Sequence, residues 1–227
     1  EDAIYSLAID SNNDIFVAGG TTSLDFPTTP FAYNSNYLDS LDADAFVSKI
    51  QSDGSQLLNS TYFGSTNYDQ AYFVEISNNL DVYLFGQTKA QGNSLIFNTN
   101  YFQVNGNQFI SIFSPDLSVL KKSTVVGSGK GSPDISPTAF LVDVCNRVYF
   151  SGWGSNIGGG TLSTLNLPVT ANCFQSTTDG NDFYLMVINE SLDSVVYATY
   201  FGGSQSAEHV DGGTSRFDKK GIIYQSV

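Results

Sequence analysis

Acidic side chains are the most numerous charged groups in this chain. Asp and Glu number 22 against 9 Lys and Arg, which gives a formal net charge of -13. Three aspartates, Asp39, Asp42 and Asp44, cluster beside a long loop, and carboxylate oxygens are ligands that Ca²⁺ prefers. A calcium site at this cluster is one hypothesis, and the alternative is that the chain needs no cofactor.

A second acidic spacing, Asp10-x-Asn12-x-Asp14, has the oxygen pattern that begins a calcium-binding loop. It lacks the glycine that should follow, and Thr21 stands where such a loop carries a bidentate glutamate. Asp and Asn also favour tight turns, because their side chains accept hydrogen bonds from the nearby backbone. We therefore predict a turn here.

Residues that could take part in catalysis are few. His209 is the only histidine, and a Ser/His/Asp arrangement would have to use it with Asp211. No sequence feature brings these two residues together with a serine. A glycosidase needs a pair of carboxyl groups, and the glutamates neither recur with the repeat nor cluster: Glu1, Glu75, Glu190 and Glu208. We therefore predict that the chain is not an enzyme.

These residues belong to an internal repeat, whose presence determines the fold class. Residues 10–19, 77–86 and 143–152 align with one another, and a fourth copy begins at Phe217. Later in each unit the segments 44–50, 107–113 and 181–188 align through Phe46, Phe109 and Phe183. Each unit closes on a similar segment, at residues 60–64, 123–127 and 198–202.

Each unit contains four short apolar or β-branched segments separated by turns. In the first unit these are residues 4–9, 15–18, 45–50 and 57–63. The turns at 11–14 and 52–55 consist of Asn, Asp, Gly and Ser, as antiparallel hairpins require. Several segments are apolar on both faces, so each sheet must be covered by its neighbours. The sequence predicts an all-β fold, a β-propeller of four-stranded antiparallel blades in which Phe46, Phe109 and Phe183 are equivalent.

About three and a half blades fit in the chain, so we expect a single partial propeller over residues 1–227. The expected blades are residues 1–68, 69–135 and 136–208, with the start of a fourth at 209–227. Closed propellers have about four to eight blades. We therefore expect the natural polypeptide to continue and to supply the remaining blades.

The connection between the second and third strands is long in every unit. In a propeller these connections share one face with the links between blades, and long loops usually bind or cover something. The candidate ligand-binding residues on this face are Trp153, His209, Tyr68 and Asp69. Trp153 could stack on a sugar ring. Packing against the adjacent blade is the alternative role for Trp153 and His209.

Several motifs resemble a known family. The segments Asp25-Phe-Pro-Thr-Thr-Pro30, Asp44-Ala-Phe-Val-Ser-Lys49 and Ser60-Thr-Tyr-Phe-Gly64 resemble the SBBP-type β-propeller repeat of bacterial secreted proteins. Residues 149–153, 167–170 and 208–218 look like the version in large Bacteroidota surface proteins with gliding-motility-associated C-terminal sorting domains. The resemblance implies export by the type IX pathway, residence on or outside the outer membrane, and no established catalytic activity.

Composition and charge exclude several classes of protein. With 41% hydrophobic and 14% charged residues, the chain is not disordered. Its negative charge would repel a nucleic-acid backbone, and no apolar run approaches the roughly 20 residues that span a bilayer, so we expect neither nucleic-acid binding nor membrane insertion. We predict an extracellular binding or scaffold module that acts in adhesion or in protein or glycan interaction. A carbohydrate-active lyase or glycosidase on a propeller frame is the alternative, and a purely structural spacer is the third interpretation.

Overall fold

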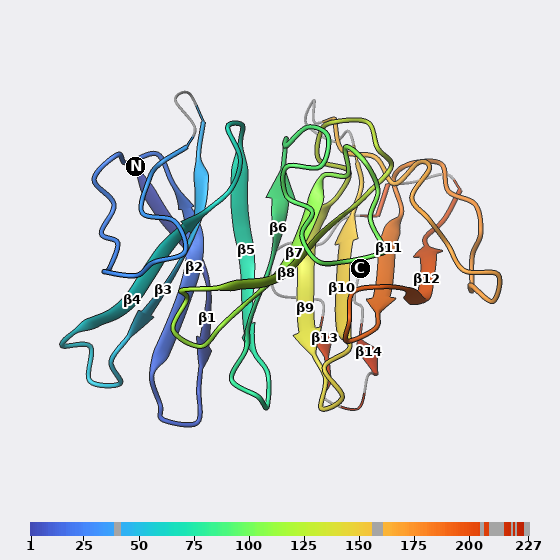
Figure 1. Ribbon diagram of the computed structural model, residues 1–227. Coiled ribbons are helices and arrows are strands. Elements are labelled where there is room, and N and C mark those ends of the chain that lie inside the picture. Colours follow the sequence, from blue (N-terminus) through green and yellow to red (C-terminus); the bar gives the residue numbers. More distant parts are fainter. Residues whose placement is uncertain are drawn as a thin grey trace.

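The computed structural model describes residues 1–38, 42–155, 161–204, 207–208, 216–218, 220 and 222–224. Within these ranges all regular secondary structure is β-strand (Figure 1). The part of the chain that is described accordingly offers no helix of the length and apolarity needed to cross a membrane. The predicted all-β class is confirmed.

Three sheets follow one another along the chain, each with four antiparallel strands in sequential order. The first contains β1 (Asp2–Ile9), β2 (Ile15–Thr21), β3 (Asp44–Ile50) and β4 (Leu57–Phe63). The second contains β5 (Asp69–Ile76), β6 (Val82–Thr88), β7 (Gln108–Phe113) and β8 (Leu120–Val126). The third contains β9 (Ser136–Val142), β10 (Val148–Trp153), β11 (Phe183–Ile188) and β12 (Val195–Phe201). A short pair follows, β13 (Arg216–Phe217) and β14 (Ile223–Tyr224). The predicted four-stranded antiparallel units are confirmed, and none of the three sheets is closed.

The hairpin turn between the first two strands is built from local hydrogen bonds. Asp10 Oδ1 accepts the backbone N–H groups of Asn12 (2.8 Å) and Asp14 (3.0 Å). Lys49 Nζ lies 3.0 Å from the Asp10 carboxylate and 3.2 Å from that of Asp14. Asp143 repeats the arrangement in the third sheet, where its Oδ1 accepts two backbone N–H groups. The predicted turn is confirmed, and its carboxylates bind the backbone and a lysine.

Neighbouring sheets pack face to face through aromatic side chains. Phe63 of the first sheet meets Phe109 of the second with ring centroids 5.1 Å apart. On the opposite face of the second sheet, Phe85 meets Phe150 of the third at 4.6 Å. Each pair belongs to a continuous buried cluster that joins two sheets. Because side chains alternate along a strand, the second sheet presents one face to the first sheet and the other to the third.

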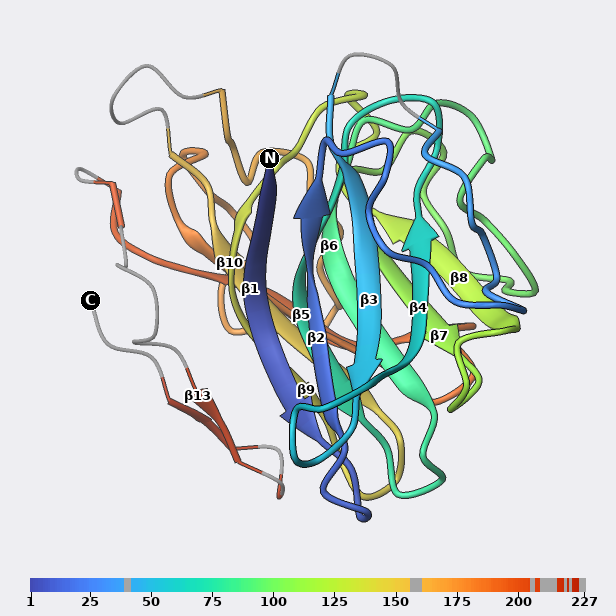
Figure 2. The ribbon, with the colours of Figure 1, turned by 90° about the vertical axis from the view of Figure 1, so that its left-hand side faces the viewer.

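The first strands of successive sheets contact one another. β1 contacts β5, β5 contacts β9, and β9 contacts β13. The order β1, β5, β9 can be followed from left to right in Figure 1, and Figure 2 shows the sheet of β1 to β4 facing the viewer. The first strands therefore form a contiguous row, from which the other strands of each sheet extend.

The register of the third sheet corrects the predicted alignment of the aromatic residues. The glycine at the same place in each second strand pairs with Phe46, Phe109 and Tyr184. Phe183 is one residue out of place, and the prediction that it is equivalent to Phe46 was wrong. Since adjacent strand residues point to opposite faces, Phe183 lies on the other side of its sheet. The equivalent position nevertheless holds a buried aromatic ring in all three sheets.

The long loops return along the fourth strand of their own sheet. In the first sheet the N–H of Thr29 donates to the carbonyl of Ser60 (3.2 Å), and in the third the N–H of Thr170 donates to that of Ala198 (3.1 Å). The Phe26 ring lies 4.3 Å from the Phe46 ring. The loops thus satisfy an otherwise open sheet edge and cover part of the adjacent face.

Candidate binding site beside the third sheet

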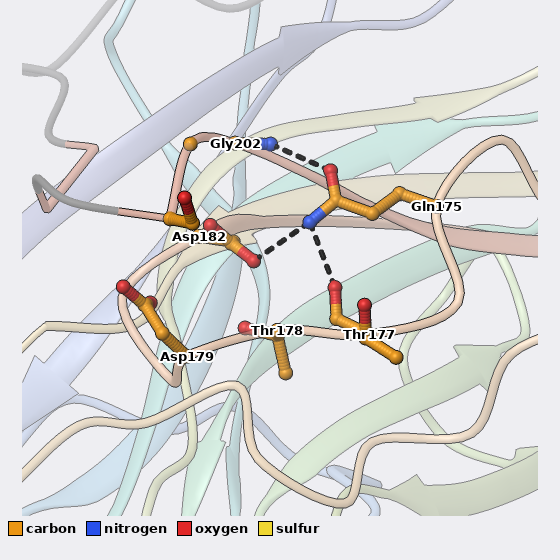
Figure 3. A pocket seen from close by; sticks show the side chains of 8 residues that line it. Gln175, Thr177, Thr178, Asp179, Asp182 and Gly202 are labelled. Carbon is orange, nitrogen blue, oxygen red and sulfur yellow. Dashed lines mark hydrogen bonds between the residues drawn. The ribbon is translucent and has the colours of Figure 1, made fainter.

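A polar cavity of about 510 Å³ opens between the long loop of the third sheet and the segment that leaves β12. Loop residues from 175 to 182 form one side, and residues 202 to 204 form the other (Figure 3). The lining consists of amide, hydroxyl and carboxyl side chains with glycines: Gln175, Thr177, Thr178, Asp179, Asp182, Gly202, Gly203 and Ser204. Such a wall can bind a polar ligand through hydrogen bonds.

Gln175 joins the two sides of this cavity. Its Nε2 donates to Asp182 Oδ2 (3.0 Å) and to the carbonyl of Thr177 (2.8 Å). Its Oε1 accepts the N–H of Gly202 (3.0 Å), as the dashed lines in Figure 3 show. The Gln175 backbone also accepts the N–H of Tyr200 in β12 (3.2 Å). A single amide can both donate and accept, so Gln175 fixes the loop against the strand.

Asp182 lines the cavity and forms a carboxyl pair with Glu208, which is not one of the lining residues. Asp182 is fully buried where β11 begins, and Glu208 Oε1 accepts the N–H of Gly203 (2.9 Å). Asp182 Oδ1 and Glu208 Oε2 are buried atoms with no hydrogen-bond partner among the described residues. Both oxygens lie against Gly202, where an added Cβ would collide with them. Burial raises the pKa of Asp182; the Thr178 hydroxyl opposes the rise, and the Glu208 carboxyl adds to it.

An acid occupies the place of Glu208 after each sheet. Ser65 donates its N–H (2.5 Å) and its hydroxyl (2.8 Å) to Asp69 Oδ2. Ser128 donates its N–H (2.8 Å) and its hydroxyl (2.7 Å) to the two carboxylate oxygens of Asp134. These acids share one role: each accepts the N–H of the residue that follows the glycine after the fourth strand of its sheet. The acids are Asp69, Asp134 and Glu208.

A second recurring position, just before or at the start of the third strand, faces this acid. It holds Asp44, Asn107 and Asp182 in the three sheets, all fully buried. We call the three resulting pairs the first junction (Asp44 and Asp69), the second junction (Asn107 and Asp134) and the third junction (Asp182 and Glu208). The first and third junctions hold two acids, whereas the second holds one acid and one amide.

The first and second junctions stabilise a buried acid in different ways. Burial raises the pKa of Asp69 to about 7 against hydrogen bonds from Thr88 and Ser65, and the Asp44 charge adds to the rise. In the second junction, Lys130 Nζ lies 3.2 Å from Asp134 Oδ1. Asn107 there donates its Nδ2 to the carbonyl of Thr88 (2.8 Å). The second junction is thus neutralised by a lysine.

The four predicted ligand-binding residues do not come together within the described part of the chain. The Tyr68 hydroxyl donates to Gln70 Oε1 (2.9 Å), while the adjacent Asp69 side chain binds Ser65. Trp153 ends β10, is half-buried, and is absent from the described wall of the cavity beside Gln175. His209 lies outside the described residues. Their role in ligand binding stays a prediction.

The predicted calcium cluster is described only in part. Asp39 lies outside the described residues. Asp42 is exposed and its carbonyl accepts a hydrogen bond from the Tyr37 hydroxyl, whereas Asp44 is buried and accepts the N–H of Leu38 (2.6 Å). Across the described ranges, no three His, Cys, Asp or Glu side chains are grouped so that they could hold a metal ion. A calcium ion at Asp39, Asp42 and Asp44 stays a prediction.

Comparison of the chain with protein-family models and with curated proteins found no match. The resemblance to SBBP repeats therefore stays a hypothesis that depends on its motifs. What the chain can bind has to be inferred from the geometry of its own residues.

The sequence did not reveal the carboxyl pairs. The expectation that Glu208 stands apart from the repeat was wrong, because it occupies the place of Asp69 and Asp134. Two differences between the units conceal this recurring acid in the sequence. It is Asp in two units and Glu in the third, and its distance in sequence from the preceding glycine differs in every unit. An alignment that requires an acid after Gly64, Gly127 and Gly202 would have found it.

Proposed function

We propose that this chain is part of a β-propeller that serves as an extracellular binding or scaffold module. The repeated packing of the sheets supports the propeller. The second sheet contacts the first through one face and the third through the other, and the first strands form a row. Continued around an axis, this arrangement gives a ring of blades with the first strands at the centre.

The exposed face of the first sheet supports the presence of further blades in the same polypeptide. Leu57 is 38% exposed there, whereas Leu120, at the same place in the second sheet, is 9% exposed because the first sheet covers it. Ile4 is 61% exposed on the same face, and the face contains an apolar hollow of about 330 Å³. A preceding or ring-closing blade would cover these side chains.

The observation that carries the binding function is the polar cavity beside Gln175. Its wall carries hydroxyl, amide and carboxyl side chains around a space of about 510 Å³, which is large enough for one or two sugar residues or for a peptide side chain. Hydroxyl-rich glycans and polar protein loops both match this wall chemically, since each offers donors and acceptors in close succession. We therefore infer a protein or glycan ligand and a role in adhesion.

The carboxyl pair of the third junction is the observation that favours the second candidate, a glycosidase or lyase. Glycosidases place their two carboxyl groups about 5–5.5 Å or about 6.5–9.5 Å apart so that a glycosidic bond or a water fits between them. Asp182 and Glu208 instead meet over Gly202, and a similar pair recurs at the first junction. A feature that recurs at sheet junctions suits architecture better than catalysis.

Localisation on or outside the outer membrane is part of the proposal and follows from the SBBP resemblance. Export by the type IX pathway would require a C-terminal sorting domain in the full-length polypeptide. Detection of the protein on intact cells with an antibody against this chain, before and after surface proteolysis, tests this element independently of ligand binding.

A binding screen tests the function. The purified chain is applied to glycan arrays and to immobilised host proteins, with Trp153→Ala, with Asp179→Ala in the cavity wall, and with Asp53→Ala in an exposed turn as a matched control. Binding that Asp179→Ala weakens and Asp53→Ala preserves supports the proposed site. Binding lost only in Trp153→Ala would move the site to the strand end. Turnover of a polysaccharide would overturn the non-enzymatic assignment, and the absence of any ligand would leave the spacer role.

A further inference from the structure

At the third junction Asp182 Oδ1 and Glu208 Oε2 are buried without a hydrogen-bond donor among the described residues, and the same holds for Asp69 Oδ1 at the first junction and Asn107 Oδ1 at the second. At the third junction both atoms belong to carboxyl groups that lie in contact with each other. Asp182 is 0% exposed, and neither its Oδ1 nor Glu208 Oε2 accepts a hydrogen bond from any described group. A buried carboxylate without a partner is costly, since the lost hydration is not replaced. Two such oxygens side by side add charge repulsion to this cost.

The second junction shows how the same arrangement is neutralised elsewhere in the chain. There Asn107 replaces one acid and the Lys130 ammonium lies 3.2 Å from the other, Asp134. In the third junction both positions are acids, and the salt bridges between described residues include neither Asp182 nor Glu208. Among the described residues, no lysine or arginine takes the corresponding place in the third junction.

We propose that Asp182 and Glu208 bind a hard divalent cation such as Ca²⁺ between their two buried oxygens, beside the cavity. Asp182 Oδ1 and Glu208 Oε2 supply the two charged ligands. The Thr178 hydroxyl lies near enough to affect Asp182, and water would complete the oxygen shell that Ca²⁺ requires. This site is separate from the calcium cluster predicted at Asp39, Asp42 and Asp44, and it does not depend on what the cavity binds.

The chemistry of the residues matches such an ion. Ca²⁺ accepts 6–8 oxygen ligands in flexible geometry and commonly includes water, so two carboxylates are enough for a weak site. Affinities of extracellular calcium modules lie at roughly 0.1–1 mM, and we expect this range.

Thermal unfolding of the full chain in the presence of CaCl2 tests the proposal. After treatment with EDTA and buffer exchange at pH 7.5, CaCl2 well above the expected Kd should raise the Tm by roughly 3–8 °C over NaCl of equal ionic strength. Calorimetric titration should report one site. Asp182→Asn and Glu208→Gln keep the shape of the side chains and should each remove the Tm shift and the binding heat.

Asp134→Asn at the second junction is the matched control and should retain the calcium effect in full. A wild-type Tm that CaCl2 does not raise above NaCl overturns the proposal, as does a calcium shift of unchanged size in both Asp182→Asn and Glu208→Gln. Stabilisation on acidification to pH 5 without any response to calcium also overturns it, because a proton shared by the two carboxyl groups would then be the positive partner.

Discussion

The second and third junctions perform the same structural task with different chemistry. Each joins the start of a third strand to the segment that leaves the sheet, around a glycine that leaves no room for a Cβ. The second junction contains Asn107, Asp134 and Lys130, and every oxygen of Asp134 has a partner, whereas Asn107 Oδ1 has none in the described part of the chain. The third contains Asp182 and Glu208, each with an oxygen that has none among the described residues. The comparison indicates that the repeat conserves the geometry of the junction while its charge is free to vary, which allows one copy to acquire a function.

Asn107→Asp should have the largest effect on stability, because it makes the second junction acidic like the third. The substitution removes the Nδ2 donor that binds the Thr88 carbonyl and places a second buried carboxyl group beside Asp134. We expect the free energy of unfolding to fall by about 3–5 kcal/mol at neutral pH. Urea denaturation measures this loss. Stability within about 1 kcal/mol of wild type would show that the junctions tolerate charge more easily than their burial suggests.

Asp69→Asn tests how the buried acid of the first junction makes stability depend on pH. Burial raises the pKa of Asp69 to about 7 from an ordinary value of 3.8, so the folded chain keeps this proton where the unfolded chain loses it. The contribution of Asp69 to stability is complete below the unfolded pKa and is lost as the pH rises to about 7. Asp69→Asn should therefore be more stable than wild type at pH 8, by roughly 2 kcal/mol, and close to wild type at pH 4.

Urea denaturation of both proteins between pH 4 and pH 8, in EDTA, measures this difference. Asp53→Asn, in an exposed turn, is the control and should follow the wild-type curve. Parallel curves for wild type and Asp69→Asn would contradict the prediction, since they would show that Asp69 titrates alike in the folded and unfolded chains.

Lys130→Met removes the cation from the second junction and keeps the length of the side chain. Because Asp134 is buried and Lys130 is partly exposed, we expect a loss of about 1 kcal/mol, smaller than a fully buried pair would give. The double variant Lys130→Met/Asp134→Asn should recover part of it, and the double-mutant cycle gives the pair energy. An interaction energy near zero would mean that Lys130 contributes nothing to neutralising Asp134.

Asp179→Asn should have the smallest effect. Asp179 is exposed at the rim of the cavity, where its Oδ1 accepts the N–H of Asn181 (2.9 Å), and asparagine retains that acceptor. We expect a change in stability of at most about 0.5 kcal/mol and a modest weakening of calcium binding through the lost long-range charge. Loss of calcium binding as complete as in Asp182→Asn would make Asp179 a direct ligand.

The sequence predicted the features that depend on short segments. The hairpin at Asp10 to Asp14 follows from side chains that bind their own backbone, and the strand at residues 57–63 was predicted with the bounds that the structure gives. The register of β11 was predicted incorrectly, because Phe183 and Tyr184 are adjacent aromatic residues and composition does not distinguish which one faces the preceding sheet. The pairing of the glycine in β10 with Tyr184 decides it.

The sequence predicted the region of the candidate site but not the residues that form it. The long connection before β11 was expected to carry a binding surface, and a polar cavity lies there. Trp153 was predicted because it is the only tryptophan in the sequence. The residues at the cavity and the third junction are of common types and far apart in the sequence: Gln175, Asp182 and Glu208. Their importance comes from burial and proximity, which composition and spacing do not report.

Taken alone, the amino-acid sequence determined the repeat, the β-strands and the hairpin turns, because alternation and turn preference act between residues close together in the chain. The tertiary structure decided which face of each sheet is covered, which aromatic ring fills each equivalent position, and which acids meet at a junction. Those outcomes depend on contacts across whole strands, where a shift of one residue reverses the direction of a side chain. The unpartnered oxygens of Asp182 and Glu208 belong to this second group.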